Sequence, residues 1–558
     1  MRNSACTLLL ALALASNAAG QQKYVNPVLY SDYSDPDVEA VDGEFWFTSS
    51  SFNCVPGLQI LHSYNLVDWD IVGAALPACS PYWDDVVAHP DHGNSVWAPS
   101  IRYRKSDSRF YIFWGDADRG VFQVNTDDPR GVWTDPVCVL EGKGIIDPCP
   151  LFDDDGRVYV VHSWAGSRAG FKSALCVCEL DSECTRTISE QVMVFDGNKS
   201  GDPTVEGPKF YKKDGWYWIF APAGGVKTGW QLAMRSKSVY GPYECRRVCE
   251  AAEPEDVAKG RAAATKAPHQ GGWVEDCKGQ YWFMHFEDRE AWGRIVHLEP
   301  MEWTPDGWCV IGKDIDGDGI GEPVKSWPMP ASVKDAGPAN LSGVCTDADF
   351  THPYIPLNWQ WHGKPSVSWA MTNPAEGCLR LNCIVHDAGW KNLWNTSNLL
   401  LEKVVGPSME LSSKLVFRPS YPGDRAGMVV MGHSYGTIEM YYDGMNVQLQ
   451  RRDCSVASEG AAEEVLASIP LESEQFAEDV KFCTVHLRVK IEDRTPRKGV
   501  ETWPPVVQCT FSYSLDGRKF NALDPVFIAS PGHWIGAKVG YFATADIKKN
   551  DGGSVEIH

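Results

Sequence analysis

Short segments in which aromatic and β-branched residues follow a polar turn recur along the first half of the chain. Five of them, beginning at Asp42, Asp107, Asp154, Lys213 and Cys277, read DGEFWFTSSS, DSRFYIFWGD, DDGRVYVVHSW, KDGWYWIFAPAGG and CKGQYWFMHFED. A turn of Gly, Asp or Ser before such residues is typical of a strand that leaves a β-hairpin. The pattern therefore predicts five strands, each entered from a tight turn.

A second short segment precedes each of these strands, so the repeating unit is strand, turn and strand. The preceding segments are SDPDVEAV, VWAPSIRY, IIDPCPLF, VEGPKFYK and HQGGWVED. The five units span residues 34–286, and their spacing leaves room for four strands in each. Five such repeats predict a five-bladed β-propeller. Helical patterns are scarce, and the best of them, at 251–267, is interrupted by Pro254 and Gly260.

Three carboxylates occupy nearly the same register in three of the repeats. Asp147 and Glu206 each lie nine residues before the glycine of the following turn, and Asp35 lies eight residues before its own. The innermost strand of each propeller blade lines the central channel, so we expect these side chains to meet at a common centre. An isolated acid before proline is usually a turn residue. An acid and a carboxylate across a sugar ring are, however, what glycoside hydrolysis requires.

The pattern changes after a Pro- and Ala-rich stretch, PMPASVKDAGPANL, at residues 328–341. Beyond it, segments such as GCLRLNCIV, RAGMVVMGHS, TIEMYYDG and GAKVGYFATA alternate with a period of two, which predicts a β-sandwich. We therefore expect a propeller at 21–327, a linker at 328–341 and a sandwich at 342–558. The short linker favours a sandwich that packs rigidly on the propeller, with an independent carbohydrate-binding module as the alternative.

Composition and the N-terminal residues narrow the class of protein. The net charge is −22, and such an acidic surface disfavours nucleic acid and anionic membranes as partners. Residues 1–20, MRNSACTLLLALALASNAAG, combine a basic start, an apolar run and small residues, which predicts a signal peptide and a secreted protein, extracellular or periplasmic. The later chain has no apolar run of ~18 residues, so no transmembrane segment is expected.

Export would permit disulfides, and the cysteine count bears on them. The chain has 18 cysteines, and removing Cys6 with the signal peptide leaves an odd number, so at least one would stay free or pair with another chain. Their scattered spacing does not match a zinc site. We expect most to be buried small hydrophobes or to form a few disulfides.

Six segments resemble, in chain order, the motifs of glycoside hydrolase family 43. SDPDV, GIIDPCPLFDDDG and VEGPKFYKKDGWYWIFAPAGG are similar to its three acidic motifs, and GNSVWAPSIRY, HQGGWV and WGRIVHLEPMEW to its other pocket segments. LNWQWHGKPSVSW, GDRAGMVVMG and FSYSLDGRKF resemble the concanavalin-like jelly roll appended to many exo-acting members, which can supply a loop to the pocket rim. The resemblance implies an inverting exo-glycosidase, a β-xylosidase or α-L-arabinofuranosidase, that removes pentoses from plant xylan, arabinoxylan or arabinan.

Carried over residue by residue, the resemblance assigns a role to each acid. It makes Asp35 the general base, Glu206 the general acid and Asp147 the carboxylate that orients the acid and modulates its pKa. Inversion would place the carboxyl groups of Asp35 and Glu206 roughly 6.5–9.5 Å apart. Asp37 shares a strand face with Asp35, but the family pattern favours the acid directly before Pro36.

The resemblance also implies five substrate-binding residues: Phe52, Trp97, His269, Gln270 and Arg294. Phe52 is expected beside the pocket and Trp97 in its wall, although a plain core role is the alternative for Trp97. His269 begins the fifth inner strand, at a position that lies near a bound cation in relatives, so it is a candidate metal ligand if it is not structural. Arg294 resembles a sugar-binding arginine, with Arg289 as its competitor.

No organic cofactor is implied, and a structural or channel calcium ion is the one candidate. DIDGDGIGE, at 314–322, resembles a calcium loop, but Lys325 stands at the twelfth position, where an EF-hand needs Glu. We interpret the segment as a tight acidic turn. Two other functions compete with inverting hydrolysis. A retaining fructan-cleaving propeller would begin with a segment like NDPNG, and a non-catalytic sugar-binding propeller would lack one of the three acids.

Overall fold

A computed structural model describes most of the chain. It covers residues 22–77, 90–262, 268–333, 343–345, 347–387, 389–471, 474–477, 480–494, 506–547 and 552–558. The predicted signal peptide at 1–20 and the larger part of the predicted linker at 328–341 lie outside these residues, so both remain predictions. Among the described residues, none of the helices has the length and apolar character needed to cross a bilayer.

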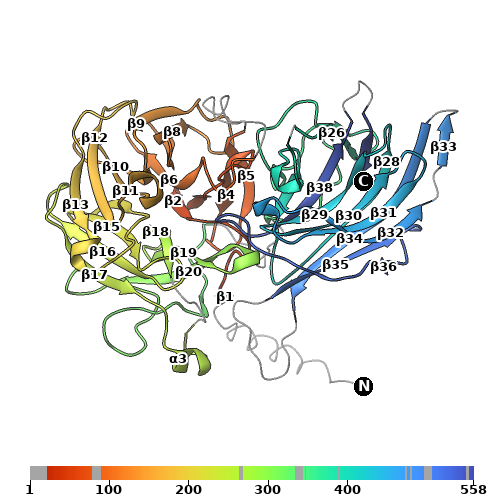
Figure 1. The fold of residues 1–558 in the computed structure, drawn as a ribbon. Helices are drawn as coiled ribbons and strands as arrows, with labels where there is room; N and C mark the ends of the chain where they lie inside the picture. The colour runs from red at the N-terminus through yellow and green to blue at the C-terminus, as the bar shows by residue number, and fades with distance from the viewer. Residues whose placement is uncertain are drawn as a thin grey trace, which may run out of the picture.

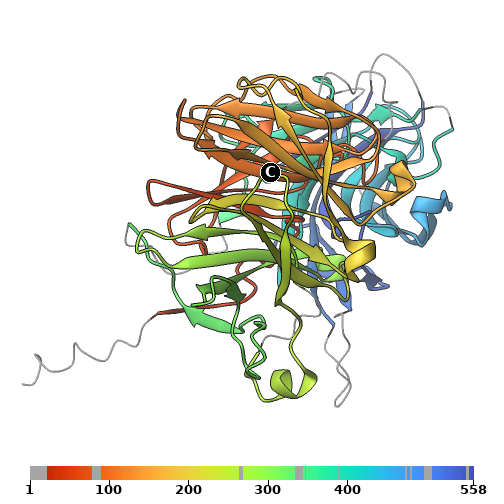
Figure 2. The same ribbon diagram turned by 90° about the vertical axis from the view of Figure 1, so that its left-hand side faces the viewer.

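The N-terminal half forms five four-stranded antiparallel sheets around a common centre (Figures 1 and 2). The first two are β2 (Asp37–Val41), β3 (Glu44–Thr48), β4 (Gly57–Ser63) and β5 (Asp70–Leu76), then β6 (Trp97–Arg104), β7 (Arg109–Asp116), β8 (Gly120–Thr126) and β9 (Val137–Glu141). The third is β10 (Ile145–Phe152), β11 (Val158–Trp164), β12 (Ala174–Leu180) and β13 (Val192–Asp196). The last two are β14 (Lys209–Lys213), β15 (Trp216–Ala223), β16 (Trp230–Ser236) and β17 (Glu244–Cys249), then β18 (His269–Glu275), β19 (Tyr281–Asp288), β20 (Arg294–Trp303) and β21 (Cys309–Ile311).

This arrangement confirms the predicted five-bladed propeller, and strand β11 shows why the sequence forms it. Val158 and Val160 pack in the same apolar cluster as Phe113 of the second blade. Tyr159 and Val161 pack instead with residues of the fourth blade. Because alternate side chains point to opposite faces of a strand, a continuous run of β-branched and aromatic residues is needed to bury both faces between neighbouring blades.

The two ends of the propeller sequence meet on the fifth blade. Leu29 forms an antiparallel bridge with Val296 of β20, and Tyr33 N donates to Arg294 O at 2.9 Å. Further out, β1 (Lys23–Val25) pairs with β22 (Ser326–Pro328). The segment that leads into the first blade therefore lies along the last one, which holds the ring of blades closed.

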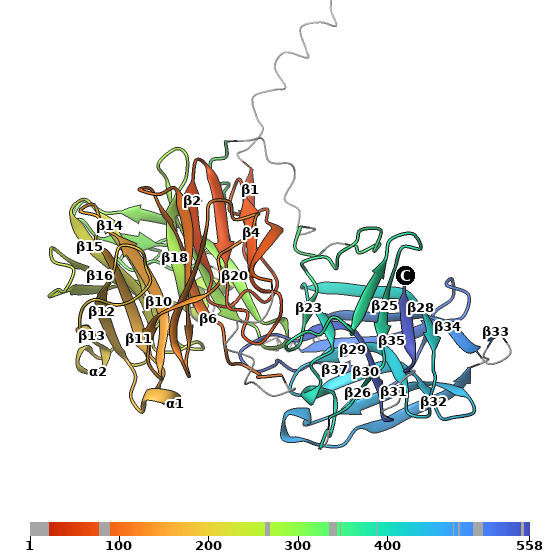
Figure 3. The same ribbon diagram turned by 90° about the horizontal axis from the view of Figure 1, so that it is seen from above.

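The C-terminal half forms two large sheets that face each other (Figure 3), which confirms the predicted β-sandwich. One sheet has the order β23 (Gln360–Trp361), β27 (Leu400–Lys403), β38 (Lys538–Ala545), β29 (Arg425–Met431), β30 (Tyr435–Tyr442), β31 (Val447–Cys454) and β32 (Glu464–Leu471), with β26 (Ile384–Val385) beside β38. The other has the order β24 (Ala370–Asn373), β25 (Cys378–Asn382), β39 (Ser554–Ile557), β28 (Ser408–Arg418), β34 (Val480–Asp493), β35 (Val507–Ser514) and β36 (Asn521–Ala522), with β33 (Glu474–Ala477) beside β34 and β37 (Phe527–Ile528) beside β35.

The sandwich packs on the propeller through a shared apolar core. Tyr30 and Trp292 of the propeller belong to the cluster that fills the sandwich. The indole Nε1 of Trp292 donates to Asp493 Oδ1 at 2.7 Å, which fixes the ring across the boundary. The packed arrangement expected from the short linker is therefore the one observed, rather than an independent module.

Helices are short throughout the described part of the chain. They are α1 (Gly166–Ala169), α2 (Gly197–Ser200), α3 (Pro254–Ala258) and the 3₁₀ turns η2 (Glu290–Trp292), η4 (Leu393–Asn395) and η5 (Ala457–Glu459). Within the described residues 251–262 of the helix candidate at 251–267, the helix is α3, which starts at Pro254, a residue suited to a first helical turn. Most of the described cysteines are buried and form no disulfide, as expected of small hydrophobes.

Below the mouth of the channel, a buried ion-pair group ties three inner strands together. Asp37 of β2 is fully buried, and its Oδ2 accepts hydrogen bonds from Ile101 N at 2.8 Å and Arg102 Nη1 at 2.6 Å. Lys209 of β14 places its Nζ 3.8 Å from Asp37 Oδ1 and donates to Ser100 Oγ at 2.8 Å. Asp37, the competitor of Asp35 for a catalytic role, is thus committed to holding the first, second and fourth blades together.

We predict that Asp37→Asn lowers the free energy of unfolding by about 3–5 kcal/mol, because it leaves two buried cations without their carboxylate. Chemical denaturation followed by fluorescence measures the change. Asp154→Asn is the matched control, since Asp154 lies exposed in a turn and its loss should cost at most ~1 kcal/mol. Equal stability of the two variants would contradict the structural role of Asp37.

Candidate active site

A cavity of about 570 Å³ opens where the inner strands begin, and residues from all five blades line it. Its lining includes every site residue predicted from the sequence: Asp35, Phe52, Trp97, Asp147, Glu206, His269, Gln270 and Arg294. Neither Asp37 nor Arg289 is among the lining residues. Arg289 instead donates to the hydroxyl of Tyr30 at 3.1 Å, so Arg294 is the arginine that reaches the cavity.

One residue at the start of each inner strand has a left-handed backbone conformation, and these residues gather around the cavity. They are Asp35 (φ 55°), Ala98 (φ 35°), Asp147 (φ 56°), Gly207 (φ 57°) and Gln270 (φ 32°). Proline follows four of them and glycine the fifth, and the ladders of β6, β10 and β18 shift register at this point. A bulge of this kind re-aims a side chain, so the recurring acid–proline steps turn the acids towards a common space.

Asp147 and Glu206 have equal spacing to the following turn glycines, but Glu206 is offset by one residue from the left-handed position of its strand. Asp147 is itself the left-handed residue of its strand, whereas Glu206 directly precedes left-handed Gly207. A Cβ atom at position 207 would lie 2.5 Å from the side chain of Gln270. Only glycine fits there without displacing Gln270, and the acid of this blade therefore comes from the neighbouring position.

Asp35 is held from both sides of its carboxyl group. Ser50 Oγ donates to Oδ2 at 2.5 Å, and Ala98 N in turn donates to Ser50 Oγ at 2.7 Å. Arg294 Nη1 donates to Asp35 Oδ1 at 3.3 Å. Because the serine and the arginine come from different blades, this carboxyl group has a defined orientation before any ligand binds.

Asp147 is as deeply buried as Asp35, each being 5% exposed. Its Oδ2 accepts hydrogen bonds from Gly207 N at 2.8 Å and from Ser163 Oγ at 3.1 Å. Burial, and then the negative charges of Glu206 and Asp35, raise the pKa of Asp147 to about 7, although the hydrogen bonds from Gly207 and Ser163 act in the opposite direction. This group consequently changes its charge near neutral pH, next to the other two acids.

Glu206 is the acid most open to the cavity, with 26% of its side chain exposed. Its Oε1 lies 3.4 Å from Nε2 of His269, which is buried at the start of the fifth inner strand. Within the described residues, neither ring nitrogen of His269 has a hydrogen-bond partner. One imidazole and one carboxylate do not make the set of six to eight oxygens that Ca²⁺ requires, so a calcium ion here would depend on water for most of its ligands.

Two aromatic residues predicted for the pocket lie close together at its rim, Trp97 at the start of β6 and Phe52 in the loop after β3, which is bridged to Val96. Trp97 is partly exposed to the cavity and donates from Nε1 to Gly93 O at 2.8 Å. Phe52 is buried and left-handed (φ 49°), and its N–H donates to Val96 O at 3.0 Å. Trp97 therefore forms a wall of the cavity rather than part of the core.

Sequence analysis missed several lining residues, and one of them comes from the sandwich. Trp534 lies in a loop before β38, and its indole ring stands 5.6 Å from the guanidinium of Arg294. Its carbonyl oxygen accepts a hydrogen bond at 3.3 Å from Ser34, the neighbour of Asp35. The sandwich thus supplies a loop to the pocket rim, a contribution that the resemblance allowed but the sequence left open. Further lining residues not predicted are Trp164, Lys172, Thr204, Lys227 and Thr228.

The acidic segment at 314–322 lies outside this cavity. Asp314 accepts hydrogen bonds from Gly317 N at 2.6 Å and Gly319 N at 3.0 Å. Carboxylate oxygens of Asp314, Asp316 and Asp318 lie within 4.8 Å of one another, and the last two residues are exposed. The segment has the hydrogen bonds of a tight turn, as interpreted from the sequence.

Comparisons with known proteins agree with this geometry. The sequence model of glycosyl hydrolases family 43 matches residues 24–309, and that of the beta xylosidase C-terminal Concanavalin A-like domain matches residues 347–557. A solved structure of an engineered family 43 glycoside hydrolase is 26% identical, with a TM-score of 0.77 over 96% of this chain and 98% of the other. A family 43 protein of Bacillus licheniformis shares the fold at 23% identity, with a TM-score of 0.75 over the same shares.

Two curated relatives cover nearly the whole chain. One, named putative beta-xylosidase, from Xylanibacter ruminicola, is 31% identical over 530 residues, which is 94% of this chain and 87% of the relative. The other, a non-reducing end alpha-L-arabinofuranosidase of Bacteroides ovatus, is 27% identical over 87% of this chain and 90% of the relative. With its propeller, its appended sandwich and its cavity of three acids, the chain belongs to glycosyl hydrolase family 43.

Proposed function

We propose that this protein is an inverting exo-glycosidase that removes terminal xylose or arabinofuranose from hemicellulose or its oligosaccharides. The observation that carries the proposal is the meeting of Asp35, Asp147 and Glu206 in one cavity, each delivered by a different blade. The similar proteins named beta-xylosidase and alpha-L-arabinofuranosidase support both sugars as substrates. The signal peptide predicted at 1–20 supports secretion, which would bring the protein to polysaccharides outside the cell.

The environments of the three acids suit three different roles. Glu206 is the exposed acid, so it can reach the glycosidic oxygen and protonate it as the leaving group departs. Asp35 is fixed by Ser50 and Arg294, so it can orient a water molecule and accept its proton as that water attacks the anomeric carbon. Asp147 touches Gly207 N, next to Glu206, and acts on the acid through its charge.

The cavity also supports cleavage at chain ends. The Asp37–Arg102–Lys209 group fills the channel two to four residues further along the same inner strands. A sugar that enters from the mouth therefore meets a polar, closed floor. Phe52, Trp97 and Trp534 present apolar surface around it, and aromatic faces of this kind pack against sugar rings.

We predict that the purified protein releases nitrophenol from nitrophenyl β-D-xylopyranoside, α-L-arabinofuranoside or both, and that Asp35→Asn abolishes the release. Asp37→Asn is the control variant, because Asp37 is the competitor of Asp35 for the role of base. It is assayed at a temperature at which it stays folded, and it should retain activity. Activity retained by Asp35→Asn would transfer the role of base to another residue. Sugar binding without turnover by the wild-type protein would favour a non-catalytic propeller.

We predict that Glu206→Gln distinguishes poor from activated leaving groups. An alkyl or sugar leaving group needs a proton, so kcat/KM on xylobiose or an arabino-oligosaccharide should fall by about 10²–10⁴-fold. Nitrophenolate departs without a proton, so the loss on nitrophenyl pentosides should be far smaller. A loss of the same size on both substrates would exclude Glu206 as the general acid.

We predict that Asp147→Asn moves the alkaline limb of the pH profile of kcat/KM to lower pH, by on the order of one unit. When Asp147 and Glu206 are both ionised their charges repel each other, so the pair keeps its last proton until the pH approaches about 7, where Asp147 titrates. The aspartate thus helps to retain one proton in the pair. The neutral amide cannot do so. Asp155→Asn, in the exposed turn of the same blade, is the control. An unchanged limb, or a shift to higher pH, would contradict this role.

A further inference from the structure

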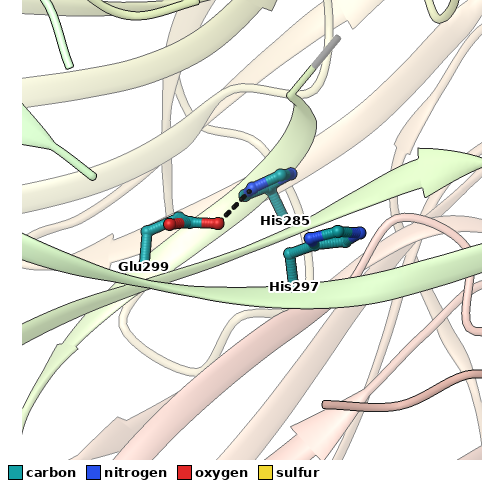
Figure 4. A group of neighbouring side chains, drawn as sticks. All are labelled: His285, His297 and Glu299. Atoms are coloured by element: carbon teal, nitrogen blue, oxygen red, sulfur yellow. Dashed lines mark hydrogen bonds and ion pairs between the residues drawn. The ribbon is translucent and has the colours of Figure 1, made fainter. Parts of the chain in front are cut away.

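A group of buried imidazoles and carboxylates lies in the fifth blade, away from the cavity. His285 of β19 and His297 of β20 are direct partners in the strand ladder, and their rings stack at 5.3 Å with an angle of 18° between planes. Glu299 follows on β20, and ligand atoms of all three residues lie within 4.8 Å of one another (Figure 4). The three side chains are at most 3% exposed, and the cavity lining includes none of them.

The hydrogen bonds of His285 leave two acceptors facing each other. Its Nδ1 lies 3.3 Å from the carbonyl oxygen of Phe286, which can only accept, so the ring proton belongs on Nδ1. The lone pair of Nε2 then points at Glu299 Oε1, 3.3 Å away, which is also an acceptor. A cation between these two atoms would satisfy both, and a backbone carbonyl on the opposite nitrogen is the usual support of a metal-binding histidine.

His297 and Glu287 also lack hydrogen bonds, at both polar atoms of each side chain. In the described part of the chain neither ring nitrogen of His297 has a hydrogen-bond partner, nor does either carboxylate oxygen of Glu287. Arg289 Nε lies 3.6 Å from Glu287 Oε2 as an ion-pair partner, but buried polar atoms that lack hydrogen bonds remain costly. Glu287 Oε2 lies 3.3 Å from His297 Nε2. Glu287 is therefore placed to orient the imidazole ring without itself being one of the three ligands.

We propose that His285, His297 and Glu299 bind a divalent transition-metal ion of the Zn²⁺ class, with Glu287 as the outer carboxylate that orients His297. Two imidazoles and one carboxylate suit zinc and its neighbours in the first transition row, whereas Ca²⁺ and Mg²⁺ prefer sets of oxygens.

The position of the site indicates a structural role rather than a catalytic one. Glu299 Oε2 accepts a hydrogen bond from Val324 N at 2.7 Å, and its Oε1 accepts one from Asn26 Nδ2 at 3.3 Å. Asn26 lies at the start of the propeller sequence and Val324 lies near its end. An ion on Glu299 would therefore fix the point at which the ring of blades closes.

The test is metal content and metal-dependent stability of the full-length protein. Elemental analysis of protein dialysed against zinc and then against buffer should find about one ion per chain. After chelation, added Zn²⁺ should raise the Tm by several degrees, as expected when an ion binds only the folded state, whereas Ca²⁺ and Mg²⁺ should not. Co²⁺ in place of zinc should give visible absorption bands.

His297→Gln should lose the bound ion and the zinc-dependent rise in Tm. His162→Gln, which changes a buried histidine of the third blade outside this group, should keep both. A folded wild-type protein that binds no zinc or Co²⁺ and shows no rise in Tm would overturn the proposal. So would a His297→Gln variant that binds zinc like the wild type. If His297→Gln does not fold, the chelation and Co²⁺ measurements on the wild type decide the question alone.

Discussion

A left-handed residue at one register of every inner strand decides which way the functional side chains of this propeller point. A straight strand would send alternate side chains into the gaps between blades, where the apolar clusters lie. The local turn of the backbone at Asp35, Asp147 and Gly207 frees polar side chains from that packing. Non-glycine residues adopt this conformation at a cost, and the packed blades on either side supply the stability that maintains it.

Asp35 and Asp37 differ sharply in their surroundings, although only two residues separate them at the start of the first inner strand, which begins at Asp37. Asp37 is paired with Arg102 and Lys209 and holds blades together. Asp35, two residues earlier, meets a serine, an arginine and open space. The first blade thus carries an acid for stability and an acid for chemistry two residues apart, and the groups that contact each acid distinguish their roles.

Much of this could be predicted from the sequence because the relevant signals are local. The segment IIDPCPLF coincides with β10, and the strand predicted after the next turn contains β11. Trp534 could not be found in this way, because it reaches Arg294 from a loop more than 200 residues away along the chain. The pairing of His285 with His297 depends on the register of two strands, which residue spacing does not reveal. In the described residues 251–262, the weak helical pattern gives only α3, which begins at Pro254 and ends before Gly260.

The sandwich contributes to both stability and site. Its core includes Tyr30 and Trp292 of the propeller, and its Trp534 stands beside the arginine that holds Asp35. Folding of the second domain is therefore coupled to completion of the cavity in the first.

The stereochemistry of the first product tests the catalytic arrangement most directly. Proton NMR can follow the anomeric signal of the sugar released from a β-D-xyloside or an α-L-arabinofuranoside, before mutarotation mixes the anomers. A base that activates water opposite a separate acid predicts inversion, so a β-xyloside should first yield α-xylose. Release of β-xylose would show retention through a covalent intermediate, and would contradict the roles assigned to Asp35 and Glu206.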